Sequence, residues 1–305
     1  MPLLDVHGQP VNVIDRGDGD AVVFLHAFPL QAAMWDYQIE ALEATNRCIA
    51  VDLPGFGQSP PPEAPDDASM KGWSDLVTEV LDQLGVASAT VVGASMGGYL
   101  AMALLRHHPD RVGALVLVGS RARSDDPSVA QRRTTQQDQL REGAEVSSLA
   151  KETVEGLLSS GSMNRTELVE YVHALADGAD VEGWIAALEA MKDRPDSMLL
   201  LRQSDVRALV VVGELDRVTP IAEAMSLRSL LKGELVIVPN VGHLPNIEDP
   251  LAFNSALVSF LGVTPPEPEP EPELAADDVA DPDVVPAADA AAPDGEDAAR
   301  VEPTD

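Results

Sequence analysis

Three residues, each a few positions beyond an apolar run, have the side chains that nucleophilic catalysis requires. Ser95 lies in the stretch VVGASMGGYLAM, Asp216 comes soon after ALVVVG, and His243 comes soon after ELVIVP. A serine hydroxyl is a weak nucleophile at neutral pH, so it needs a base such as histidine, and that base needs a carboxylate to orient it. The chain order Ser, Asp, His therefore predicts a nucleophile, an acid and a base for attack on a carbonyl group.

Each of these residues alone has an ordinary structural explanation. The pattern Gly-x-Ser-x-Gly around Ser95 also suits a tight turn between a strand and a helix, in which bulky neighbours do not fit. An aspartate such as Asp216 often caps a helix, and a lone histidine such as His243 often has a structural role. Three strand ends that supply the required side chains in the required order favour the catalytic interpretation.

Transfer of an acyl group also needs N–H donors for the negative charge that develops on the carbonyl oxygen. The backbone N–H of Met96, directly after the candidate nucleophile, is one predicted donor. The loop HAFPL supplies the second, the N–H of Phe28. His26 begins this loop. We consider it as a base and as a residue at the substrate pocket, but its position favours bracing the loop.

Short β-branched runs alternate with helical patterns and predict the scaffold for these residues. The apolar runs cover residues 21–26, 48–53, 90–94, 114–119, 208–213 and 234–239. Amphipathic stretches lie near 34–44, 70–84, 97–107, 220–232 and 250–262. This alternation predicts an α/β fold with a mainly parallel, twisted sheet and helices on both faces. The runs LLDVHG and VNVIDRG predict an N-terminal hairpin.

Two segments depart from this alternation. Residues 122–205 have helical patterns without strand signals, which predicts a helical cap inserted into a core made of residues 1–121 and 206–263. Residues 264–305 lack aromatic residues, are rich in Pro, Ala and Glu, and carry fourteen acidic residues and one arginine. Such a segment is predicted to be disordered. It serves either as a solubilising tail or as a docking tail for a basic partner.

Composition narrows the classes of partner. The net charge of −31 argues against nucleic acid and anionic membranes as partners, and no run of about 18 apolar residues predicts a membrane span. The first residues lack the basic and apolar blocks of a secretory signal. Cys48, the only cysteine, lies in an apolar run, so we expect a core residue and a cytoplasmic protein without an internal disulfide. The acidic composition also admits adaptation to high salt.

These motifs together resemble the α/β-hydrolase family over about residues 3–262. In family order they are HAFP, DLPGFGQS, GASMGG, GELDRVTP and GHLPNIEDP. The resemblance implies Ser95 as nucleophile, Asp216 as acid and His243 as base, with the N–H groups of Phe28 and Met96 as the oxyanion hole. It also implies that no cofactor or metal is needed.

Within the family the chain is most similar to small serine carboxylesterases, 3-oxoadipate enol-lactonases and cofactor-free haloperoxidases or perhydrolases. A small ester or lactone is the substrate that this resemblance implies. Hydrolysis of C–C bonds and a non-catalytic ligand-binding receptor remain open on the same residues. Dehalogenases and epoxide hydrolases use an aspartate nucleophile, so Ser95 argues against both. Ala27 stands where many members have glycine, and we expect only a modest adjustment of the loop.

Several other residues have two interpretations each. Trp35 is either packed under a helix or part of the pocket wall. Arg121 and Arg123 are either surface charges or partners for a substrate carboxylate. Asp125 and Asp126 are alternative acids for the histidine, and His107 and His108 suit a helix end better than a metal site. The sequence contains no metal-ligand cluster and no nucleotide-binding loop, and it leaves the oligomeric state open.

Overall fold

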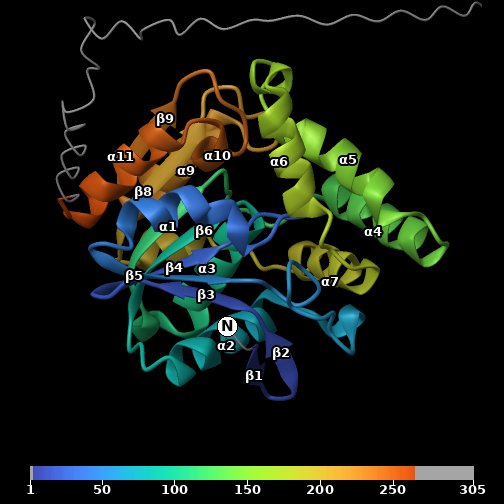
Figure 1. The fold of residues 1–305 in the computed structure, drawn as a ribbon, viewed down its shortest axis with the longest axis horizontal. Helices are drawn as coiled ribbons and strands as arrows, with labels where there is room; N and C mark the ends of the chain where they lie inside the picture. Colours follow the sequence, from blue (N-terminus) through green and yellow to red (C-terminus); the bar gives the residue numbers. More distant parts are fainter. Residues whose placement is uncertain (1–2, 265–305) are drawn as a thin grey trace, which may run out of the picture. The chain divides into compact units, whose positions relative to one another are not determined.

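The computed structural model describes residues 3–264, so the acidic segment predicted to be disordered lies, from residue 265 on, outside the described residues. A seven-stranded sheet has the order β3-β5-β4-β6-β7-β8-β9 (Figure 1). Its strands are β3 (Val13–Arg16), β4 (Asp20–Leu25), β5 (Asn46–Val51), β6 (Ala89–Ala94), β7 (Val112–Val118), β8 (Arg207–Gly213) and β9 (Glu234–Val238). All neighbours pair in parallel except β3 with β5, so the predicted sheet type is confirmed.

The N-terminal hairpin forms over a shorter segment than predicted. β1 (Leu4–Val6) and β2 (Gln9–Val11) pair antiparallel in a small sheet of their own. The following residues VIDR form β3 and pair antiparallel with β5, with Val13 opposite Val51. The prediction that residues 11–17 are one hairpin strand is therefore wrong. β3 instead covers the edge of β5, which would otherwise leave its backbone groups unpaired.

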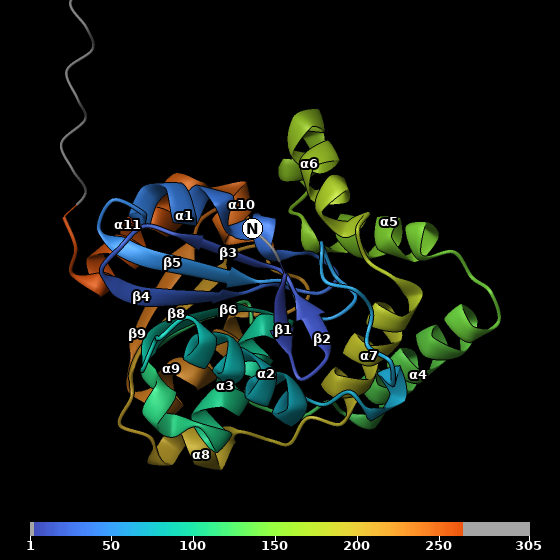
Figure 2. The same ribbon diagram turned by 60° about the horizontal axis from the view of Figure 1, so that its bottom comes forward.

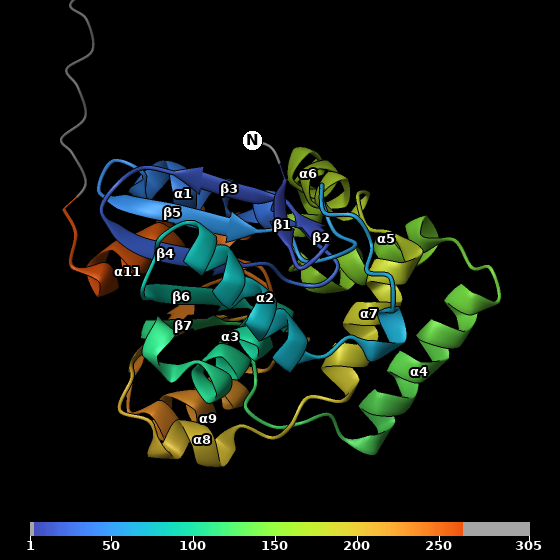
Figure 3. The ribbon, with the colours of Figure 1, turned by 90° about the horizontal axis from the view of Figure 1, so that it is seen from below.

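Helices cover both faces of the large sheet, as Figures 2 and 3 show. One face carries α1 (Asp36–Leu42) and α11 (Pro250–Leu261), and the other carries α2 (Met70–Gln83), α3 (Met96–His107) and α9 (Ile221–Leu231). The short α10 (Pro245–Glu248) precedes α11. Because both faces are covered, successive residues of β7 such as Leu115, Val116 and Leu117 are all fully buried. None of the helices within residues 3–264 is long and apolar enough to cross a membrane.

The segment between β7 and β8 is helical. It contains α4 (Pro127–Arg141), α5 (Val146–Leu157), α6 (Thr166–Ala176), α7 (Val181–Lys192) and α8 (Met198–Gln203). Helices α4 to α7 gather on the side toward which the parallel strands point, whereas α8 lies with α9 (Figures 1 and 3). Helix α4 begins at Pro127, and the Asp126 side chain accepts the N–H groups of Ser128 and Val129. The division into a core and a cap stays a prediction.

A buried ion cluster joins separate parts of this helical segment to one another. Asp125, just after β7, lies 2.6 Å from Arg133 of α4 and 2.8 Å from Arg194, which follows α7. Its side chain is 1% exposed and that of Arg194 is 4% exposed. Burial alone favours the neutral acid. The hydrogen bond and charge of Arg133, together with Arg194, nevertheless hold the pKa of Asp125 below its ordinary value of 3.8.

We expect Asp125→Ala to lower the free energy of unfolding by about 3 kcal/mol, because Arg194 would stay buried without its partner. The loss should be complete at neutral pH. It should shrink as the pH falls below about 4, since a carboxylate with a lowered folded-state pKa stabilises the protein only while it is ionised. Urea unfolding of both proteins at several pH values measures this difference.

Asp138→Ala is the matched control, because Asp138 is 59% exposed and reaches Arg141 only at 3.5 Å. Its effect should stay within about 0.5 kcal/mol. Equal losses in the two variants would contradict the role assigned to the buried cluster.

Candidate active site

Ser95 lies at the sharp turn from β6 into α3, in a backbone conformation that few non-glycine residues adopt. Its φ is +50° and its ψ is −107°. Its N–H donates to the Val118 carbonyl at 2.8 Å, and its own carbonyl accepts the N–H groups of Gly98 and Tyr99 at 3.0 and 3.2 Å. Strain of this kind persists only where the surroundings over-determine it, and it gathers at functional sites. The side chain is half-buried.

Glycines let the start of α3 press against the strand ends. A methyl group on Gly97 would lie 2.1 Å from the Leu25 carbonyl oxygen at the end of β4, and one on Gly93 would lie 2.3 Å from the Gly97 carbonyl oxygen. Backbone therefore meets backbone, with no room for a side chain. This contact brings the first turn of α3 next to the HAFPL loop, which begins at His26.

Asp216 and His243 form a buried pair. The His243 Nδ1 lies 2.8 Å from one Asp216 carboxylate oxygen, and the side chains are 1% and 0% exposed, respectively. The other carboxylate oxygen accepts the N–H groups of Val218 and Thr219, both at 2.8 Å. With Nδ1 donating to the carboxylate, Nε2 is left as an acceptor. Within residues 3–264, this buried Nε2 has no hydrogen-bond partner.

The residues after β7 bring the pair next to Ser95. A methyl group on Gly119 would lie 3.0 Å from both Nδ1 and Cε1 of His243. The residues on either side of this glycine bond the Ser95 backbone: the Val118 carbonyl accepts its N–H, and the Ser120 hydroxyl donates to its carbonyl at 3.1 Å. The structure thus gathers all three residues singled out from the sequence around the end of β7.

The HAFPL loop is fixed by His26. This side chain is fully buried, accepts the Leu53 N–H on Nε2 at 3.1 Å, and has Nδ1 3.0 Å from the Ala27 carbonyl. Burial lowers the pKa of His26, against the opposing charge of Asp52. The ring is therefore neutral and bonded through both nitrogens. It braces the loop, is not placed to act as a base, and offers no surface to a substrate, contrary to its assignment to the pocket.

Two backbone N–H groups lie where the HAFPL loop meets the start of α3. Among the described residues, neither the Phe28 N–H nor the Met96 N–H donates a hydrogen bond. Unpaired N–H groups near the interior are uncommon. The Phe28 ring packs edge-on against Trp184 of α7, with centroids 4.6 Å apart. The donor-bearing loop is thus in contact with the helical segment.

Comparison with known proteins identifies the family of this chain. A family model described as alpha/beta hydrolase fold matches residues 20–250. The chain belongs to the α/β-hydrolase family. The structure of a thermophilic esterase from Thermogutta terrifontis superposes with a TM-score of 0.80 at 31% identity, covering 86% of this chain and 96% of that one.

Two further relatives are lactonases. The 3-oxoadipate enol-lactonase 2 of Acinetobacter baylyi is 28% identical over 244 residues, covering 79% of this chain and 88% of that protein. The structure of the enol-lactonase from Burkholderia xenovorans has a TM-score of 0.79 at 25% identity, covering 86% of this chain and 100% of that one. The chain is therefore a hydrolase of the esterase and lactonase branch.

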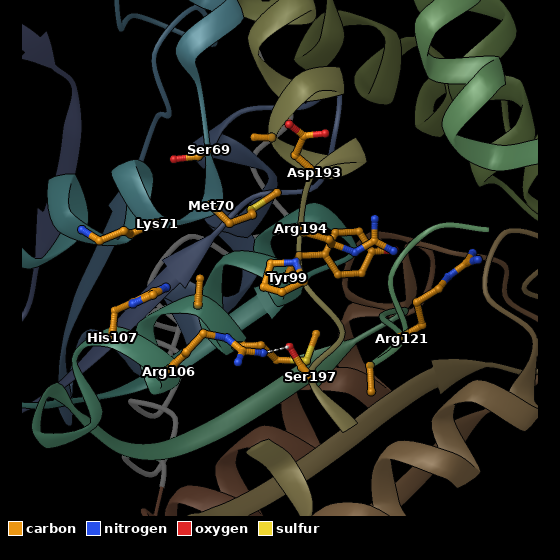
Figure 4. Close-up of a pocket in the computed structure, with 15 residues that line it drawn as sticks. Ser69, Met70, Lys71, Tyr99, Arg106, His107, Arg121, Asp193, Arg194 and Ser197 are labelled. Carbon is orange, nitrogen blue, oxygen red and sulfur yellow. Dashed lines mark hydrogen bonds between the residues drawn. The ribbon is translucent and has the colours of Figure 1, made fainter. Parts of the chain in front are cut away.

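In this α/β-hydrolase, two further residues assigned to the pocket from the sequence have structural contacts instead. Trp35 is fully buried and packs against Phe24 and Phe253, with ring centroids 5.3 and 6.1 Å away, so it belongs to the core and not to a pocket wall. Arg121 donates to the Val218 carbonyl at 2.8 Å and lines a separate cavity beside α3 (Figure 4). Asp125, considered as an alternative acid, is occupied by two arginines.

One residue of the site was missed in the sequence. Glu248 is buried, and its carboxylate accepts the N–H groups of Gly242 at 2.8 Å, Leu244 at 3.3 Å and Ser159 at 2.9 Å. It therefore holds both sides of His243 and joins this loop to the helical segment. The only signal was an acidic residue in the stretch HLPNIED, which by itself does not identify the groups it binds.

We expect Glu248→Gln to lower the free energy of unfolding by about 2 kcal/mol. The NH₂ group of the new amide would face either the Ser159 N–H or the N–H groups of Gly242 and Leu244, and two donors cannot bond each other. Hydrolysis of a p-nitrophenyl ester should slow as the His243 loop shifts. Chemical unfolding and initial rates measure the two effects. Glu214→Gln is the control, since the exposed Glu214 carboxylate accepts, within residues 3–264, the Asn240 N–H alone, at 3.0 Å. Equal stabilities and equal rates in the two variants would disprove the role of Glu248 in holding the His243 loop.

Proposed function

We propose that this α/β-hydrolase is a serine hydrolase that cleaves small carboxylic esters through an acyl-enzyme. The observation that carries the proposal is the buried His243–Asp216 pair, whose Nε2 has no partner within residues 3–264, beside the strained turn of Ser95. A base that is oriented by a carboxylate and not otherwise bonded is ready to accept a hydroxyl proton.

In the first half-reaction, the Ser95 Oγ attacks the ester carbonyl carbon while His243 Nε2 takes the proton of the Ser95 hydroxyl. Asp216 holds the ring through Nδ1 and stabilises the imidazolium that forms. The tetrahedral intermediate collapses, His243 gives its proton to the alkoxide, and the alcohol leaves. Water then attacks the acyl-enzyme by the reverse proton movements and releases the acid. These steps need only protein groups and water.

The oxyanion hole of this mechanism consists of the Phe28 and Met96 N–H groups. Both are unbonded among the described residues, and both lie where the first turn of α3 meets the HAFPL loop. Fixed donors stabilise the charge on the tetrahedral oxygen without the reorganisation that water requires. His26 keeps the loop in position through its bonds to Leu53 and Ala27.

A lactone is the second candidate substrate, because two of the relatives are enol-lactonases. A lactone is an internal ester, so the same attack and the same oxyanion hole serve both, and only the leaving alcohol stays attached. Rates on short and long p-nitrophenyl esters, five- and six-membered lactones and a β-diketone decide between them. We expect the short esters to be fastest, and faster lactone turnover would assign the chain to the second candidate.

We expect Ser95→Ala to reduce turnover of p-nitrophenyl butyrate about 10⁵-fold, because no other group in the site supplies the attacking oxygen. A fluorophosphonate should label the natural protein and not the variant. Ser160→Ala, at an exposed serine of the helical segment, should keep full activity. Wild-type rates in Ser95→Ala would disprove the mechanism, and a natural protein that is neither labelled nor active would favour a ligand-binding receptor.

We expect Asp216→Asn to reduce the same rate about 10⁴-fold, because an amide cannot hold His243 in the tautomer that leaves Nε2 free. The matched control is Asp126→Asn, in which the amide oxygen still accepts the N–H groups of Ser128 and Val129 that cap α4. That variant should keep its activity. Loss of activity in Asp126→Asn with retention in Asp216→Asn would reassign the acid.

A further inference from the structure

A cavity of about 190 Å³ lies along the flank of α3 and away from Ser95. Its walls come from α3, the start of α2, residues 121–122 and residues 190–197 (Figure 4). Ser95, Asp216 and His243 are not among its lining residues. The proposed hydrolytic mechanism therefore gives this cavity no role.

One part of the wall is apolar. Met70 of α2 and Tyr99, Met102 and Ala103 of α3 line it, and these α3 residues share one face of the helix. The volume accommodates about six water-sized groups, given about 30 Å³ for each. A short hydrocarbon chain or a single ring fits this space, and burial against the apolar wall stabilises it.

The other part of the wall is cationic, which is unusual in a chain of net charge −31. Lys71, Arg106 and His107 lie on one side of the cavity, and Arg194 and Arg121 lie on the other (Figure 4). Burial, followed by the charges of Lys71 and Arg106, lowers the pKa of His107. Lys71 and Arg106 are thus close to His107, and their charges favour its neutral form.

Not all of these cations are free to bind an anion. Arg194 is paired with Asp125 and lies 3.9 Å above the Tyr99 ring. Arg106 uses only one guanidinium nitrogen, Nη2, which donates to the Asp196 carbonyl and the Ser197 hydroxyl. Among residues 3–264, its other N–H groups donate to none.

Lys71 is the second available cation. Its side chain is 62% exposed and forms a surface pair with Asp75, a kind of pair that contributes little stability and exchanges readily. The first turn of α2, a helix of 14 residues, also borders the cavity and adds the positive end of its dipole. Asp193 is the one carboxylate among the lining residues.

We propose that this cavity is a second binding site, specific for small carboxylates with a short apolar body. The carboxylate bonds Arg106 and Lys71 at the rim, and the hydrocarbon lies against Met70, Met102 and Ala103. The Tyr99 N–H donates to the Ser95 carbonyl at 3.2 Å, so an occupant contacts the helix that begins at Ser95 without entering the hydrolytic site.

Titration of the full-length protein with hexanoate at low salt, followed by ligand-observed NMR, tests the site. Arg106→Gln and Ala103→Phe should each raise the Kd for hexanoate at least about fivefold, the first by removing the cation and the second by filling the cavity. Hexanol should bind more weakly by a similar factor. Arg228→Gln, at an exposed arginine of α9 outside the cavity, should leave the Kd unchanged.

The two substitutions carry different risks of misfolding, so circular dichroism is used to check the fold of each variant. Arg106→Gln alters a partly exposed side chain and should fold normally even if Ala103→Phe overpacks the helix. No measurable binding of hexanoate, or wild-type binding in folded Arg106→Gln, would overturn the proposal. The latter result would place the ligand elsewhere, for instance beside Ser95. Ester hydrolysis is measured separately, so this test does not depend on the proposed reaction.

Discussion

The close backbone contact between the first turn of α3 and the strand ends is the constraint on which the site depends. Gly97 meets the Leu25 carbonyl, and Gly93 meets Gly97, at separations that exclude any side chain. Because of this contact the chain turns sharply at Ser95, whose φ is positive. The contact also puts the Met96 N–H beside the loop of Phe28. The positions of the proposed nucleophile and of both proposed oxyanion donors therefore follow from one packing arrangement of the backbone.

Buried carboxylates then hold the surrounding loops, and each is balanced differently. Asp216 accepts two backbone N–H groups as well as the His243 ring, and Glu248 accepts three backbone N–H groups. Asp125 is balanced instead by Arg133 and Arg194. An ionised group in the interior is costly unless such partners compensate it, so each carboxylate strongly prefers the one loop conformation that supplies them. In this very acidic chain, these three buried carboxylates therefore have specific structural roles.

The sequence predicted what is encoded locally. Apolar runs located the strands of the main sheet, helical periodicity located α2, α3 and α11, and the strand ends drew attention to Ser95, Asp216 and His243. The pairing of β3 was not predictable, because its partner β5 lies some thirty residues further along the chain and no turn connects them. The role of Glu248 was missed for a similar reason, since one of its three donors, the Ser159 N–H, lies far away in the sequence. The order of residues along the chain therefore indicates the candidate catalytic side chains. Contacts between distant residues determine how these side chains are positioned.

The helical segment contacts the loop that carries one of the two proposed oxyanion donors. The Phe28 ring packs on Trp184, so a change in α7 is transmitted to the loop whose N–H is proposed to bind the oxyanion. Trp184 is fully buried, and its indole N–H has no partner among the described residues. The helical segment and the proposed oxyanion hole are thus linked through this aromatic contact.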